Sequence, residues 1–233
     1  MDLPHREMLY MRKKKWWSNK LESKWQLLYG PLPFLLLLLP LYFLAVNKSL
    51  LFYDAPEYIK IISENSFLKA ISMGHQPIHP VFIADLWISM RLMQFVFNIS
   101  YEYAANLYAY LNGIVGVIIF WKITKYLLKE RLRIAALAIF CLFPVVFITS
   151  TNLLVESLLF PLYLFSIYIL LNYYKNKTRK HLYLFLLSIF LMLGVHVQAL
   201  LWIPTIFIFI FLTGKTKALE LKKIIPKTLF AVI

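Results

Sequence analysis

Residues Leu32–Phe52 read LPFLLLLLPLYFLAVNKSLLF and form the first long apolar run of the chain. At about 1.5 Å per residue, a helix of this length crosses a hydrocarbon core of about 30 Å. Residues 1–30 before it carry seven Lys or Arg against three acids. This pattern predicts a signal anchor behind a basic cytoplasmic N-terminal segment. A cleaved signal peptide is the alternative, but the apolar run is long and starts late for one.

The composition of the whole chain agrees with a membrane protein. The 233 residues are 61% hydrophobic and 17% aromatic, and the mean hydropathy is +0.69. These values are typical of a polytopic helical membrane protein and too apolar for a soluble domain. The single cysteine, Cys141, lies in an apolar run, which excludes a disulfide framework and a cysteine zinc site.

Basic residues mark three connections between the apolar segments. Further apolar segments run over residues 103–121, 134–149, 153–171, 182–195 and 197–212. The stretches 122–133, 172–181 and 213–227 carry 14 Lys or Arg in total. The net charge of +14 therefore comes from residues beside apolar segments, which indicates membrane topology and not nucleic-acid binding. The positive-inside rule places all three stretches in the cytoplasm.

The segment 80–97 decides the topology, because it contains both Asp85 and Arg91. If it crosses the membrane, the three basic stretches all face outward, against the positive-inside rule. If it lies along the surface as an amphipathic helix, 21 of the 25 basic residues face the cytoplasm. We therefore predict an all-α polytopic membrane protein with about six transmembrane helices. Two juxtamembrane helices, over 57–72 and 80–97, are expected in its first outer loop.

Acids and imidazoles follow the first apolar run in YDAPEY (Tyr53–Tyr58) and GHQPIHP (Gly74–Pro80). Such groups are costly beside a bilayer unless they are used or paired, so they suggest a functional site on the outer face. Asp54 and Glu57 share one face if a helix begins around Pro56. Asp54 is then either a catalytic base or the helix cap.

The two histidines of GHQPIHP, His75 and His79, are four residues apart, as in a helical metal site. Pro77 and Pro80 interrupt any regular helix there, which favours a rigid loop that presents two imidazoles. The lone Arg91 of the next segment is either a snorkelling interface anchor or a phosphate ligand.

Two further polar positions are expected on the outer face. Glu156 begins an apolar segment, where it either complements a helix macrodipole or faces a cavity. The segment 182–195 is short for a span, so together with 197–212 it predicts a hairpin with a sunken polar tip at His196 and Gln198. An ordinary tilted helix pair, with His196 bonded to a neighbour, is the alternative.

In order and spacing, these motifs resemble the N-terminal half of the GT-C superfamily of polyprenyl-phosphate-sugar glycosyltransferases. The closest resemblance is to protein mannosyltransferase and aminoarabinose-transferase-like enzymes. YDAPEYIKI resembles the acidic motif, GHQPIHPVFI the HPP-type turn with departures at Gln76 and His79, and LGVHVQALLWIP the short hairpin that carries Arg-Pro in many relatives. The resemblance implies that residues 31–233 are the N-terminal part of a transmembrane module, truncated within what would be its next helix.

The resemblance also implies a reaction. A sugar passes from a polyprenyl-phosphate-linked donor to an unidentified protein, lipid or glycan acceptor at the outer face, with inversion. Asp54 stands at the catalytic carboxylate position, and Glu57 accompanies it. The candidates for binding the donor phosphate or substrate are His75, His79, Glu156, His196, Gln198 and Arg91. A divalent cation, Mg²⁺ or Mn²⁺, held by Asp54, Glu57 or Glu156 is an alternative source of positive charge.

Two other functions stay open from the sequence. A transporter of lipid-linked substrates would be expected to carry charges within its spans, which are nearly charge-free here. A non-catalytic fragment or scaffold is the second alternative. Composition rich in Lys, Ile and Asn, without targeting motifs, favours a bacterial cytoplasmic membrane with the N-terminus inside.

Overall fold

The structure is a computed structural model that describes residues 54–73, 79–201 and 204, and every regular element within this part is a helix. In chain order the elements are α3 (Ala55–Glu64), α4 (Phe67–Ser72), α5 (Pro80–Phe97), α6 (Tyr101–Leu127), α7 (Glu130–Leu142), α8 (Pro144–Thr151), α9 (Glu156–Asn176), α10 (Arg179–Val195) and the 3₁₀ helix η1 (Val197–Leu201). The predicted all-α class is confirmed. The expected span 32–52, residues 1–30, the basic stretch 213–227 and His75 lie outside the described residues.

Three described helices are long and apolar enough to cross a membrane, namely α5, α6 and α9. A fourth candidate is the pair formed by Leu132–Leu142 and Pro144–Thr151, which is bent by 59°. The expectation of one continuous segment over 134–149 is therefore wrong. Pro144 cannot donate a backbone hydrogen bond and its ring disfavours a helical preceding residue, so the helix breaks at Phe143.

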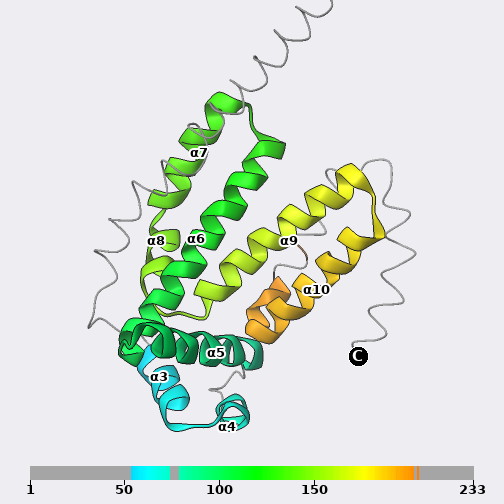
Figure 1. Cartoon of the computed structure of the whole chain (residues 1–233). Helices are drawn as coiled ribbons and strands as arrows, with labels where there is room; N and C mark the ends of the chain where they lie inside the picture. Colours follow the sequence, from blue (N-terminus) through cyan, green and yellow to red (C-terminus); the bar gives the residue numbers. More distant parts are fainter. Residues whose placement is uncertain (1–53, 74–78, 202–203, 205–233) are drawn as a thin grey trace, which may run out of the picture.

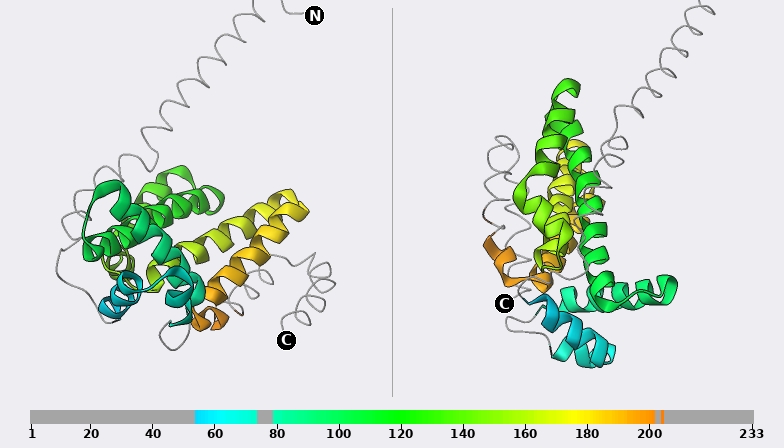
Figure 2. Two further views of the ribbon diagram at one scale, coloured as in Figure 1. Left: turned by 60° about the horizontal axis from the view of Figure 1, so that its bottom comes forward. Right: turned by 90° about the vertical axis from the view of Figure 1, so that its left-hand side faces the viewer.

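The long helices run side by side, and α5 lies across one end of them (Figure 1). Helix α6 packs against α5, α7, α8 and α9, and α9 packs in turn against α10. The right-hand view of Figure 2 shows α5 roughly perpendicular to α6. This is the orientation expected of a helix that lies along a membrane surface.

Elements far apart in the sequence meet at the end where α5 lies. Helix α3, the turn between α8 and α9, the end of α10 and η1 are all located there (Figures 1 and 2). The α6–α7 and α9–α10 connections, which carry two of the basic stretches, lie at the opposite end (Figure 1). The fold therefore separates the basic connections from the acidic and histidine motifs.

The first described segment is two helices and not the single helix expected over 57–72. Asn65 adopts an extended backbone after α3, and its Nδ2 donates to the Ile61 carbonyl at 2.9 Å. Ser66 then takes the N-cap position of α4. Trp87 Nε1 donates to the Asn65 carbonyl at 3.2 Å, which fastens the break to α5. Asn and Ser side chains compete with helical hydrogen bonds, so this pair interrupts the helix.

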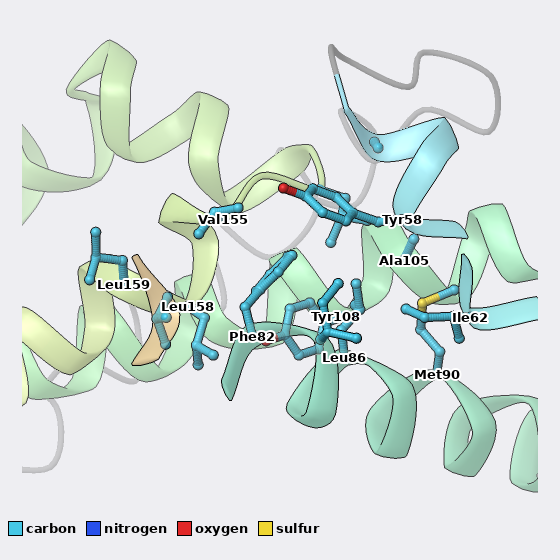
Figure 3. Close-up of a cluster of buried hydrophobic side chains, with 14 of the residues drawn as sticks. Tyr58, Ile62, Phe82, Leu86, Met90, Ala105, Tyr108, Val155, Leu158 and Leu159 are labelled. Carbon is cyan, nitrogen blue, oxygen red and sulfur yellow. The ribbon is translucent and has the colours of Figure 1, made fainter. Parts of the chain in front are cut away.

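Three aromatic side chains in edge-to-face contact join α3, α5 and α6 in the core (Figure 3). The ring centroids lie 5.1 Å apart for Tyr58 and Phe82, and 6.4 Å apart for Phe82 and Tyr108, both in edge-to-face geometry. The Tyr108 hydroxyl donates to Asp85 Oδ2 at 2.6 Å. The acid that makes 80–97 a poor spanning helix is thus paired with α6, and it fixes α5 on the bundle.

Helices α6 and α8 approach closely at Gly113. A Cβ added to Gly113 would overlap Ser150 Cβ and lie 3.3 Å from Ser150 Cα. The Ser150 hydroxyl donates to the Val146 carbonyl at 2.6 Å within its own helix, so this polar group is satisfied in an apolar contact. The absence of a side chain at Gly113 therefore sets the distance between the two helices.

Candidate functional site

The acidic motif forms the first turn of α3. Asp54 occupies the N-cap position, and Pro56 lies in the first turn, as the sequence predicts. The Asp54 side chain makes no capping hydrogen bond to α3. Both Asp54 and Glu57 are exposed. The capping alternative for Asp54 is therefore not supported by the geometry, and its carboxylate is placed where a ligand could reach it.

Tyr58 is a buried residue that lies near the predicted acids. Its backbone N–H donates to the Asp54 carbonyl at 3.0 Å, and its side chain is 2% exposed. The hydroxyl has no hydrogen-bond partner among the described residues. Burial first, and then the nearby carboxylates of Asp54, Glu156 and Glu57, raise the pKa of Tyr58 to about 12. The three predicted acids, from α3 and from the start of α9, therefore lie near enough to Tyr58 to act on its hydroxyl electrostatically.

The orientation of Tyr58 explains how Glu156 joins this group. In Figure 3 the Tyr58 hydroxyl points toward the segment that carries Val155. Val155 is the N-cap residue of α9, and Glu156 is the first residue of that helix. Glu156 is exposed and complements the positive end of the helix macrodipole. Both of the roles that the sequence leaves open for Glu156 are compatible with this position.

The imidazoles of His79 and His196 stack beside Tyr58. Their ring centroids are 4.6 Å apart with an interplanar angle of 23°, and the His79 ring lies 6.5 Å from the Tyr58 ring. His79 precedes α5 and is 2% exposed, whereas His196 follows α10 and is partly exposed. The structure thus brings together two histidines from distant parts of the chain.

Gln198 contributes through its backbone. Its N–H donates to His196 Nδ1 at 2.9 Å, and its side chain is exposed. Because Nδ1 accepts this bond, a neutral His196 carries its proton on Nε2. The first residues of η1 therefore fix the tautomer of His196. The second arm of the expected hairpin lies mostly outside the described residues.

Close packing holds α10 against the start of α5. A Cβ at Gly194 would overlap the Val81 side chain. Gly194 comes two residues before His196, and Val81 comes two residues after His79. The lack of a side chain at Gly194 therefore lets the two chain segments approach closely enough for the imidazoles to stack.

The sequence of this chain matches a known protein family. The family model of dolichyl-phosphate-mannose-protein mannosyltransferases matches residues 77–233, more than half of the chain. The chain belongs to this family. The resemblance to the GT-C superfamily is thereby confirmed, and the protein is a membrane glycosyltransferase of that general type. Comparisons with curated proteins and with solved structures found no match.

The family match covers only part of the site. His79, Glu156, His196 and Gln198 lie within the matched residues of the mannosyltransferase family, whereas the acidic turn of α3 precedes them. The structure connects the two parts, because Tyr58 of α3 contacts the His79 ring and belongs to the same buried cluster as Val155. Membership of the family also implies a lipid-linked sugar donor and a membrane setting.

Arg91 lies away from this group, at the other end of α3. One of its terminal guanidinium nitrogens donates to the Ile62 carbonyl at 3.1 Å and to the Ser63 carbonyl at 3.3 Å. Its guanidinium carbon lies 5.4 Å from the ring centroids of both Trp87 and Tyr101. Arg91 thus satisfies the last carbonyls of α3 and stacks on two aromatic rings. Phosphate binding by Arg91 stays a prediction that these contacts do not favour.

Replacing Arg91 by Lys tests this assignment. Lysine keeps the charge but loses the planar fork that reaches two carbonyls and two rings, so we expect a lower melting temperature. The KM for the sugar donor should stay within about twofold of wild type, since no contact places Arg91 near Tyr58. A raised KM at unchanged melting temperature would restore Arg91 as a phosphate ligand.

The described residues contain no group of three His, Cys, Asp or Glu side chains that could hold a metal ion. Asp54, Glu57 and Glu156 all act electrostatically on Tyr58, but they do not lie together as a metal-binding group. Binding of Mg²⁺ or Mn²⁺ by these carboxylates stays a prediction, which is tested by measuring transfer in EDTA with and without each ion.

Tyr58 is not among the residues that the sequence pattern singles out. It follows Glu57 directly and lies one helical turn after Asp54. This spacing is the only sequence signal that could have identified it, because tyrosines are frequent in the chain. Within the described part of the chain its hydroxyl has no partner, which depends on the packing of α3 against α5 and α6 and is not visible in the sequence.

Proposed function

We propose that this chain transfers a sugar from a polyprenyl-phosphate-linked donor to an acceptor on the outer face of the membrane. The observation that carries the proposal is that His79 stacks on His196 and lies beside Tyr58, a phenol on which Asp54, Glu156 and Glu57 act electrostatically. The carboxylates can supply a base for the acceptor, and the imidazoles can supply a positive or proton-donating environment for the departing phosphate.

The chemistry assigned to Asp54 is general-base catalysis. As the acceptor oxygen or nitrogen attacks the anomeric carbon, the Asp54 carboxylate takes its proton. The bond between the anomeric carbon and the phosphate oxygen breaks, and its electron pair leaves with the polyprenyl phosphate. A single displacement of this kind inverts the anomeric carbon, as in inverting glycosidases. Glu57, one turn further along the chain, is proposed to position the reacting groups beside Asp54.

The imidazoles are proposed to face the phosphate. Nε2–H of neutral His196 can donate to a phosphate oxygen, because Nδ1 already accepts from the Gln198 backbone. Such a hydrogen bond stabilises the negative charge that grows on the phosphate during bond cleavage. His75 belongs to the same motif as His79 and is proposed as a further phosphate ligand.

The proposed orientation in the membrane is supported by the separation of charges along the bundle. The basic α6–α7 and α9–α10 connections lie at the end opposite α5 (Figure 1). By the positive-inside rule this end is cytoplasmic, so the site faces outward. We propose a bacterial cytoplasmic membrane as the location, with the polyprenyl chain of the donor among the apolar helices.

The proposal is tested with the full-length protein in lipid nanodiscs. A panel of polyprenyl-phosphate sugars, with dolichyl-phosphate-mannose as its first member, is supplied together with candidate acceptors, and release of free polyprenyl phosphate is measured. We expect release from at least one donor, with an acceptor-dependent rate. If no donor in the panel gives release above that of empty nanodiscs, the transferase proposal is contradicted.

A further inference from the structure

The Tyr58 hydroxyl is a buried polar group without a partner in the described part of the chain. Leaving such a group unsatisfied costs free energy, and phenylalanine would fill the same space without this cost. The ring itself is well held, by Phe82 at 5.1 Å and by His79 at 6.5 Å. The packing of the ring therefore fixes the direction of the hydroxyl, which is left to form a hydrogen bond with a ligand.

The groups near the Tyr58 hydroxyl restrict which ligand could form a hydrogen bond with it. The groups that act electrostatically on it are the carboxylates of Asp54, Glu156 and Glu57, which accept hydrogen bonds and donate none when ionised. A ligand that fits must donate to carboxylates and accept from a phenol. Phosphate offers acceptors only and is repelled by the three negative charges. An ammonium group offers donors only.

Sugar hydroxyls satisfy both requirements, because each one donates and accepts a hydrogen bond. On the basis of the proposed function, we propose that Tyr58 and the three carboxylates form the subsite that holds the sugar ring of the donor. The phosphate of the donor then lies on the side of His79 and His196. Hydrogen bonds therefore orient the donor, with its sugar near the carboxylates and its phosphate near the imidazoles.

The test is the substitution Tyr58→Phe in the full-length protein. We expect the KM for the active polyprenyl-phosphate sugar to rise about fivefold to tenfold, the range for loss of one neutral hydrogen bond. The inhibition constant of bare polyprenyl phosphate, which has no sugar, should stay unchanged. The melting temperature without donor should be equal to or above that of wild type, because an unsatisfied buried hydroxyl is removed.

Tyr108→Phe is the matched control. It removes a hydroxyl from a tyrosine that is also 2% exposed, but this hydroxyl is bonded to Asp85. We expect a lower melting temperature and an unchanged KM for the donor. The two substitutions should therefore have opposite effects on stability and on donor binding.

The outcomes separate the two proposals. If wild type transfers sugar and Tyr58→Phe leaves the KM for the donor unchanged, the sugar subsite is disproved while the transferase function stands. The subsite is equally disproved if Tyr58→Phe weakens bare polyprenyl phosphate as much as the donor, since the contact would then be to phosphate. If wild type uses no donor in the panel, the proposed transferase function is contradicted, and the sugar subsite is contradicted together with it.

Discussion

Transfer of sugar is expected to fall by about 10²–10⁴-fold when Asp54 is replaced by Asn, the range for loss of a general base. Asparagine has the same shape but cannot take a proton from the acceptor. Because the Asp54 side chain is exposed and makes no capping bond to α3, we expect insertion and melting temperature to stay close to wild type. The rate of polyprenyl phosphate release is the measurement.

Glu64→Gln provides a matched control for this experiment. Glu64 is the last residue of α3 and is also exposed, so the substitution removes one carboxylate from the same helix at the end away from Tyr58. We expect its transfer rate to equal that of wild type. An Asp54→Asn protein that keeps full activity would rule out Asp54 as the base.

Stability is expected to fall by about 1–3 kcal/mol when Gly113 is replaced by Ala, as is typical of overpacking a tight contact. The added Cβ would overlap Ser150 Cβ and come within 2.5 Å of Ser150 Oγ. Helices α6 and α8 would have to separate, and α6 also packs against α5 and α9. The melting temperature of the purified protein in detergent is the measurement.

Two further variants distinguish a clash from a general effect of alanine. Gly116→Ala should be tolerated, because the nearest atom to its new Cβ, on Leu164, would lie at 3.8 Å. Adding Ser150→Gly to Gly113→Ala removes the overlapping Cβ and should recover part of the lost stability. Equal destabilisation by the two glycine substitutions would show that the Ser150 contact is not the cause.

The helices themselves were largely predictable, and their interruptions were not. Apolar length predicted the positions of α6, α9 and α10, although α6 and α9 continue into the basic stretches beyond the predicted segments. The break at Phe143 and the break after Asn65 both fall where a local signal exists, Pro144 in one case and Asn65 with Ser66 in the other. These signals are ambiguous because proline and polar residues also occur within helices, as Pro161 does in α9. Packing decides which of them ends a helix.

In the candidate site, too, the residues could be predicted from the sequence but their arrangement could not. Asp54, Glu57, His79, Glu156 and His196 could be selected from the sequence because ionisable groups next to apolar segments are costly. Their grouping around Tyr58 could not, since it needs α3, α5, α9 and α10 to meet at one end of the bundle. The sequence also leaves two roles open for Arg91, and the contacts with Ile62 and Ser63 favour the structural one.

By itself, the sequence determined the class of the protein, the family to which it belongs and the chemical groups available for catalysis. Hydrophobic length and charge distribution are local properties of the chain, so they can be obtained from the residues directly. Only the tertiary structure decided that the Tyr58 hydroxyl is buried near acids without a hydrogen-bond partner among the described residues, and that two stacked histidines lie beside it. Burial and proximity depend on which helices pack together, and long-range packing is not encoded in any single segment.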